Sequence, residues 1–270
     1  MKPKAKTGAE REDDETRTGR ATRGLSEGGI ELAKTVVMTE VGRSFDGRPV
    51  LSKVSLSIGA GELVGIAGPN GGGKSTLLML MAGLLRPTTG RVLVCGVDAF
   101  SLSLTTAGQV GLVTARPGLY PLLTGRENLH HFGGLFGLSE AEVDAKAEPL
   151  ARTLELSTGF DVRAGKLSTG MQQKLSLIRA LLLSPKLLLF DEPTANLDPL
   201  ASSALYAEVR RRADAGLACV LVTHDLPAAE AVCNRVLLVN GGIEKELTFT
   251  EHRAPLTGPT LAAWQQLVKR

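Results

Sequence analysis

The sequence predicts an α/β fold built around a mainly parallel sheet. Short apolar strands alternate with longer segments of helix-forming residues, which is the order that a parallel sheet requires. A strand, a glycine-rich loop and a helix follow one another directly between Leu63 and Leu85. Apolar strands return at 187–190, 220–223 and 236–239, with helical segments between them.

The remaining elements divide the chain into regions. Residues 1–29 mix both charge signs and hold few large apolar groups, so we expect a disordered charged tail that buries too little surface to fold. The folded domain is expected to span 30–247, with an inserted, mainly helical subdomain at about 100–166. The end, 248–270, is predicted to be a loop with a short helix. Further strands are expected at 35–41, 50–58, 91–95 and 110–114, and helices at 75–85, 127–136, 139–156 and 171–183.

Composition argues against nucleic-acid binding and against a membrane-spanning chain. The 270 residues carry 31 basic and 28 acidic side chains, a balance too even for the whole domain to attract nucleic acid, and the aromatic content of 4% offers few faces for stacking bases. No apolar run reaches the roughly 18 to 20 residues of a membrane-spanning helix. A secretory signal is absent and the three cysteines are isolated, so we expect a cytoplasmic protein.

The strongest motif is residues 68–75, Gly-Pro-Asn-Gly-Gly-Gly-Lys-Ser, which fits the phosphate-loop pattern G-x-x-x-x-G-K-[ST] between a strand and a helix. Glycines let backbone N–H groups converge on a phosphate, and the helix N-terminus adds positive potential. Lys74 would reach the β and γ phosphates and Ser75 would ligate Mg. The alternative is a glycine-rich turn followed by an exposed lysine. The candidate nucleotide-binding residues are Gly68, Pro69, Asn70, Gly71, Gly72, Gly73, Lys74, Ser75 and Thr76.

Two acids and a histidine end apolar strands downstream. Asp191 and Glu192 follow the strand 187–190, at the edge where parallel sheets place their ligands. We expect Asp191 to hold Mg and Glu192 to polarise the water that attacks the γ phosphate. His224 follows the strand 220–223 and would contact the γ phosphate. The alternatives are acids that mark a strand ending in solvent, and a histidine that is a helix cap or solvated.

A second segment makes the sequence recognisable. Residues 167–173, LSTGMQQ, precede LLLFDEPTANLD, and together they resemble the nucleotide-binding domains of ATP-binding cassette (ABC) transporters over about residues 31–245. The resemblance implies a P-loop NTPase (RecA-like) core with a mainly parallel sheet, an antiparallel β subdomain and the inserted helical subdomain. Alone, LSTG reads as an N-cap before a helix.

The resemblance also implies residue roles. In that family two domains enclose two ATP molecules, so Ser168 and Gly170 would bind the γ phosphate held by the partner's phosphate loop. Asp198 looks like part of the loop that crosses the dimer interface, and His224 resembles the family's switch histidine. Phe45 looks like the aromatic that stacks on adenine, although it could equally be a strand residue packed inward.

One position departs from the family. After the strand 110–114 the family usually has Gln or Glu near Mg, and here Ala115 is the matching residue. A methyl group cannot replace the carboxamide, so coupling or rate is expected to differ. The following segment is similar to the surface that receives a transporter's cytoplasmic helix. Its groove residues would be Leu119, Tyr120, Leu122 and Leu123, which could instead pack the subdomain's own core.

These observations favour an ATP-binding and ATP-hydrolysing subunit of an ABC transporter. It would use ATP and Mg, form a homodimer, and act with a separate membrane permease at the inner face of the cell membrane, in the direction of export. Two alternatives stay open: a soluble ABC-type ATPase that acts on the ribosome or DNA, and a nucleotide-binding assembly module with weak catalysis.

Overall fold

The computed structural model describes residues 34–101 and 108–249. The predicted tail at 1–29 lies outside the described residues. So does the predicted extension at 248–270, except for its first two residues.

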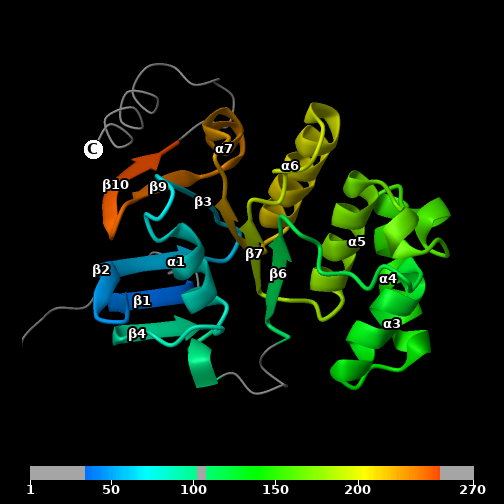
Figure 1. Cartoon of the computed structure of the whole chain (residues 1–270), viewed down its shortest axis with the longest axis horizontal. Helices are drawn as coiled ribbons and strands as arrows, with labels where there is room; N and C mark the ends of the chain where they lie inside the picture. Colours follow the sequence, from blue (N-terminus) through cyan, green and yellow to red (C-terminus); the bar gives the residue numbers. More distant parts are fainter. Residues whose placement is uncertain (1–33, 102–107, 250–270) are drawn as a thin grey trace, which may run out of the picture. The chain divides into compact units, whose positions relative to one another are not determined.

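A six-stranded sheet forms the centre of the fold, in the order β10-β9-β3-β8-β7-β6 (Figure 1). The strands from β9 to β6 are parallel, and β10 runs antiparallel to β9 at the edge. The α/β fold with a mainly parallel sheet is therefore confirmed. Its strands are β3 (Leu63–Ala67), β6 (Val110–Thr114), β7 (Leu187–Asp191), β8 (Ala218–Val222), β9 (Arg235–Val239) and β10 (Ile243–Thr248).

A smaller antiparallel sheet has the order β2-β1-β4-β5, which agrees with the expected antiparallel β subdomain. Its first two strands are 12 residues long and form a hairpin across Asp46 and Gly47, both of which have positive φ angles. Its strands are β1 (Lys34–Phe45), β2 (Arg48–Gly59), β4 (Thr89–Val94) and β5 (Val97–Asp98), followed by the 3-10 turn Ala99–Ser101.

Helices pack against the sheets and against one another. The strand β6 falls within the span of about 100–166 expected for a helical subdomain, but it pairs with β7 and belongs to the large sheet. The helices α3 and α4 follow it and pack against α5 (Figure 1). The helices are α1 (Lys74–Met81), α3 (Gly125–Leu135), α4 (Glu140–Thr153), α5 (Thr169–Leu181), α6 (Pro199–Asp214) and α7 (Leu226–Val232), with 3-10 turns at Ser157–Gly159 and Ala164–Lys166.

The helix α1 ends earlier than the sequence pattern indicates, at Met81 instead of Leu85. Gly83 takes a left-handed conformation with φ of 70°. Its N–H donates to the Leu80 carbonyl at 3.2 Å, and the N–H of Leu84 donates to the Met79 carbonyl at 3.0 Å. This pair of bonds is the Schellman arrangement, in which a glycine satisfies the last carbonyls and stops the helix.

Two apolar cores lie on the two faces of the large sheet. Because side chains alternate along a strand, Leu187 and Leu189 enter the core shared with α1 and the small sheet. Leu188 and Phe190 enter the other core, shared with α3 to α7. The central strands are thus covered on both faces, which explains their uninterrupted apolar sequence.

In the described part of the chain, no helix combines the length and the apolar character needed to cross a membrane.

Truncation of a core leucine is expected to destabilise the fold. Leu189 is 0% exposed, and Leu189→Ala should lower the free energy of unfolding by about 2 to 5 kcal/mol, because it removes buried methyl groups and leaves a cavity. The matched control, Leu135→Ala, changes a residue that is 61% exposed. It should alter the free energy of unfolding by no more than about 0.5 kcal/mol. Urea unfolding followed by circular dichroism measures both values. Equal losses in the two variants would contradict the two-core description.

Candidate functional site

The loop 68–73 joins β3 to α1 and follows a path that side chains would obstruct. A Cβ on Gly68 would collide with the carbonyl oxygen of Val239, at the end of the neighbouring strand β9. Gly73 has φ of 97°, and a Cβ there would lie 2.6 Å from a Leu51 side-chain carbon. The N–H of Gly241 donates to the Gly72 carbonyl at 3.0 Å. These contacts fix the loop against β9 and β2.

The start of α1 presents unpaired amide groups. Gly73 is its N-cap, with no side-chain cap and no acidic residue in the first turn. The first intrahelical bond runs from the N–H of Leu77 to the Gly73 carbonyl at 2.8 Å, so the amides of residues 74–76 have no acceptor within the helix. Amides of this kind, at the positive end of a helix, favour a bound anion such as a phosphate.

Lys74 extends back along the loop. Its Nζ donates to the carbonyl oxygens of Gly68 and Pro69, each at 3.0 Å. The side chain is nearly buried, and this burial lowers the pKa of Lys74 while the carboxylates of Glu192 and Asp191 oppose the shift. The amine is thus held against the loop carbonyls, and the charges of the two acids act on it.

Ser75 and Asp191 meet at the end of β7. The Ser75 hydroxyl donates to Asp191 Oδ1 at 3.2 Å. Burial raises the pKa of Asp191, and Glu192 adds to the increase, while Ser75 and Lys74 act against it. A half-buried carboxylate beside a hydroxyl oxygen is a donor set that suits a hard divalent cation. The residues present therefore fit a magnesium ion.

Glu192 and His224 form a close pair beside Asp191. His224 Nε2 lies 2.8 Å from Glu192 Oε1, and the two side chains are 43% and 34% exposed. Glu192 has φ of 49°, in the left-handed region that non-glycine residues seldom adopt. Its N–H donates to the Val222 carbonyl at 3.0 Å, which ties the end of β7 to the end of β8.

Ser168, Gly170 and Asp198 lie elsewhere in the chain. Ser168 is the N-cap of α5, and its hydroxyl accepts from the Met171 N–H at 3.2 Å. Asp198 caps α6. A Cβ on Gly170 would meet only Ala201 of α6, at 3.6 Å. In the view of Figure 1, α1 and α5 lie on opposite sides of β6 and β7. The structure thus places the start of α5 next to the first turn of α6, on the other side of β6 and β7 from α1.

Phe45 ends β1 at the hairpin and is 41% exposed, so it does not pack into the core. The guanidinium of Arg43 lies 4.4 Å from its ring centre. Arg43 thus lies over one face of the ring, and the exposed part of the ring is accessible to a planar ligand.

Ala115 lies beside Asp191, as its place after β6 indicates. Its N–H donates to the Asp191 carbonyl at 2.9 Å. Carboxamides reach the same backbone segment from two directions: Gln173 Nε2 donates to the Thr114 carbonyl at 3.0 Å, and Asn196 Nδ2 to the Ala115 carbonyl at 3.4 Å.

The expected groove residues differ in exposure. Tyr120 is 55% and Leu122 is 77% exposed, whereas Leu119 packs against the helical core and Leu123 is half-buried. The ring of Tyr120 makes an edge contact with His131, with centres 5.0 Å apart. An exposed apolar surface is thus present between β6 and α3.

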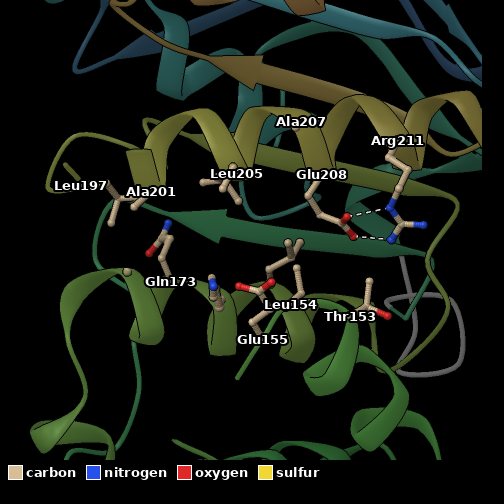
Figure 2. A pocket seen from close by; sticks show the side chains of 14 residues that line it. Thr153, Leu154, Glu155, Gln173, Leu197, Ala201, Leu205, Ala207, Glu208 and Arg211 are labelled. Atoms are coloured by element: carbon tan, nitrogen blue, oxygen red, sulfur yellow. Dashed lines mark hydrogen bonds and ion pairs between the residues drawn. The ribbon is translucent and has the colours of Figure 1, made fainter. Parts of the chain in front are cut away.

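A separate pocket of about 280 Å³ lies between α5 and α6. Figure 2 shows Gln173 facing Leu205 across it, and the ion pair of Glu208 and Arg211 on α6. Gly170 lines the pocket, and none of the residues 68–76 does.

Tyr206 contacts residues next to the candidate site, and the sequence pattern did not single it out. Its hydroxyl lies 2.8 Å from Thr194 Oγ1 and 3.2 Å from Thr223 Oγ1. It therefore bridges the segments that follow Glu192 and precede His224. The available signal was a tyrosine on the apolar face of a helix, because a buried phenol usually finds a hydrogen-bond partner.

Comparisons with known proteins identify the family. A family model described as ABC transporter matches residues 51–195. Nod factor export ATP-binding protein I of Rhizobium meliloti (strain 1021) is 35% identical over 214 residues, which cover 79% of this chain and 64% of that protein. ABC transporter ATP-binding protein NatA of Bacillus subtilis (strain 168) is 35% identical over 213 residues, covering 77% of this chain and 86% of that protein. The chain thus spans just under two thirds of the length of the first relative.

Solved structures show the same fold. A structure described as the ATP binding subunit of an ABC transporter has a TM-score of 0.74 and 29% identity, and covers 87% of this chain and 100% of its own. The ATP-binding cassette MJ0796, as a dimer in a post-hydrolysis state bound to ADP and Pi, has a TM-score of 0.71 and 28% identity. The match covers 81% of this chain and 99% of the MJ0796 chain. The resemblance drawn from residues 167–173 and 187–198 is confirmed, and the chain belongs to the family of ABC transporter ATP-binding proteins.

Proposed function

We propose that this chain binds and hydrolyses ATP as one subunit of an ABC exporter, and that ATP-driven head-to-tail dimerisation moves a substrate through a separate membrane permease. The observation that carries the proposal is the convergence of five side chains at one sheet edge. Lys74, Ser75, Asp191, Glu192 and His224 come from three separate segments and meet beside the start of α1.

The triphosphate would bind along residues 68–76. The amides at the start of α1 would hold phosphate oxygens, and Lys74 would exchange its two loop carbonyls for the β and γ phosphates. Ser75 and Asp191 would hold Mg, which neutralises phosphate charge when it is bound. Phe45, exposed at its hairpin, would stack on the adenine ring.

Glu192 would act as the general base. It would accept a proton from the attacking water while the water oxygen bonds to the γ phosphorus and the bond to the ADP oxygen breaks. His224, 2.8 Å from Glu192, would orient the Glu192 carboxylate and contact the γ phosphate. The Glu192 carboxylate contacts His224 while Asp191 contacts Ser75, so the two adjacent acids are available for different roles.

A second copy would complete each site. Ser168 and Gly170 start α5 on an exposed surface, far along the chain from the loop of their own domain. A serine hydroxyl and helix-terminal amides form half of an anion site. They would close on the γ phosphate held by the partner, with Asp198 at the interface between copies. The dimeric cassette MJ0796 bound to ADP and Pi supports this assembly by its similarity.

Export is supported by the names of relatives, which describe Nod factor export. The exposed apolar residues Tyr120 and Leu122 offer a surface for a cytoplasmic helix of such a permease. The chain would then work at the inner face of the membrane. We also propose the domain span of 30–247, with the helical subdomain as its insertion.

Glu192→Gln tests the chemistry. The variant should bind ATP as the wild type does, lose turnover by about 10² to 10⁴-fold, and accumulate an ATP-bound dimer, because the base is removed while the binding groups remain. Phosphate release and size-exclusion chromatography with ATP measure these effects. Glu244→Gln, on the exposed strand β10, serves as the matched control and should keep full turnover. Unchanged turnover in Glu192→Gln would exclude Glu192 as the base.

Ser168 tests the assembly. In the Glu192→Gln background, Ser168→Ala should weaken the ATP-dependent dimer by at least about tenfold, since each site loses a hydrogen bond to a charged phosphate. Ser139 caps α4 with the same geometry, so Ser139→Ala loses a comparable helix cap and should leave the dimer intact. Analytical ultracentrifugation over a range of concentrations measures the dissociation constant. Equal dimer strength in both variants would argue against a role for Ser168 in trans.

The permease partner is testable by purification. The tagged chain, extracted from membranes in mild detergent, should retain an integral membrane protein, and Leu122→Asp should reduce that recovery because a charge replaces an exposed apolar contact. Leu135→Asp, at a comparably exposed leucine on α3, should not. Quantitative mass spectrometry gives the ratio of the two proteins. A ribosome-bound pool without a membrane protein would instead favour a soluble ATPase.

A further inference from the structure

We propose that the hydroxyl of Tyr206 is a positioning group that holds the segment after Glu192 and the segment before His224 in one geometry. The inference rests on the proposed ATPase function and adds a residue outside the motifs.

The bridge consists of three hydroxyl groups. Tyr206 Oη lies 2.8 Å from Thr194 Oγ1 and 3.2 Å from Thr223 Oγ1. The Asp225 N–H donates to the same Thr223 oxygen at 3.0 Å. Because the Thr223 hydroxyl oxygen already accepts the Asp225 N–H, the Thr223 hydroxyl proton is free to be donated to Tyr206 Oη. The Tyr206 hydroxyl can then donate to the Oγ1 of the partly exposed Thr194. Every buried hydroxyl proton in this arrangement has an acceptor.

The middle of the bridge is shielded from water. Tyr206 is 5% and Thr223 is 3% exposed. Burial also raises the pKa of Tyr206, so the phenol keeps its proton and its capacity to donate. Hydrogen bonds in such a place hold their geometry well, because water does not compete for the same groups.

The Glu192–His224 pair needs support of this kind. Both of its side chains are more than a third exposed, and exposed pairs contribute little to their own geometry. One backbone bond, from Glu192 to Val222, ties the two strand ends directly. Thr194 lies two residues after Glu192, and Thr223 lies immediately before His224. The bridge therefore supplies a second tie between the two segments that carry the pair.

The test removes single hydroxyls with little change of shape. In Tyr206→Phe and in Thr194→Val, kcat for ATP should fall about tenfold, equivalent to about 1.4 kcal/mol of activation free energy, while KM stays close to the wild-type value. The double variant should be no slower than the slower single variant, because both changes break the same link. Thr153→Val is the matched control, since its hydroxyl donates to a carbonyl within α4, and its kcat should not change.

The outcomes separate this inference from the function on which it rests. A wild-type chain without ATP turnover would refute the proposed function itself. If the wild type is active and the kcat of both single variants lies within about twofold of the wild-type kcat, only the role of Tyr206 is overturned. A rise in KM equal to the fall in kcat, or a loss of activity that follows a lower melting temperature, would assign the bridge to binding or to stability instead. Thr194→Val changes a partly exposed side chain. If Tyr206→Phe does not fold, the kcat of Thr194→Val decides whether the bridge has the proposed role.

Discussion

The site depends on the burial of the central strands on both faces. The strands β3, β7 and β8 have no solvent-facing side, so a polar side chain within them would lose its hydration without a partner. Polar groups are therefore confined to the positions where the strands end. Since the strands are parallel, these ends lie at one edge, and the glycine loop, Asp191 and His224 follow three of them. The same apolar packing that stabilises the sheet thus gathers the charged groups.

At that edge two adjacent acids contact different partners. The strand β7 ends at Asp191, and the next residue, Glu192, takes a left-handed backbone conformation. Asp191 contacts Ser75, while Glu192 contacts His224. A non-glycine residue in this conformation costs on the order of 1 to 2 kcal/mol. The surrounding hydrogen bonds, including that from the Glu192 amide to Val222, offset the cost.

The sequence was a good guide wherever one local pattern decides the structure. Apolar runs predicted the central strands, and the spacing of glycines before Lys74 predicted the loop that precedes α1. Prediction failed where distant segments meet. Nothing near Tyr206 indicates that its hydroxyl lies between Thr194 and Thr223, because that contact depends on how α6 packs on the sheet. The end of α1 was missed for another reason: Gly83 stops a helix whose following residues are themselves good helix formers.

Ala115 shows how a departure from a family pattern is accommodated. A glutamine at this position would offer a side-chain carboxamide near Asp191, and alanine offers none. The backbone of the same segment is nevertheless held by carboxamides from elsewhere, Gln173 of α5 and Asn196 of the loop before α6. The Ala115 N–H in turn donates to the Asp191 carbonyl. Since α5 also carries Gly170 in its first turn, the segment links the proposed metal-binding edge to the helix that would face a second copy. That link passes through main-chain acceptors, which any residue at position 115 would provide.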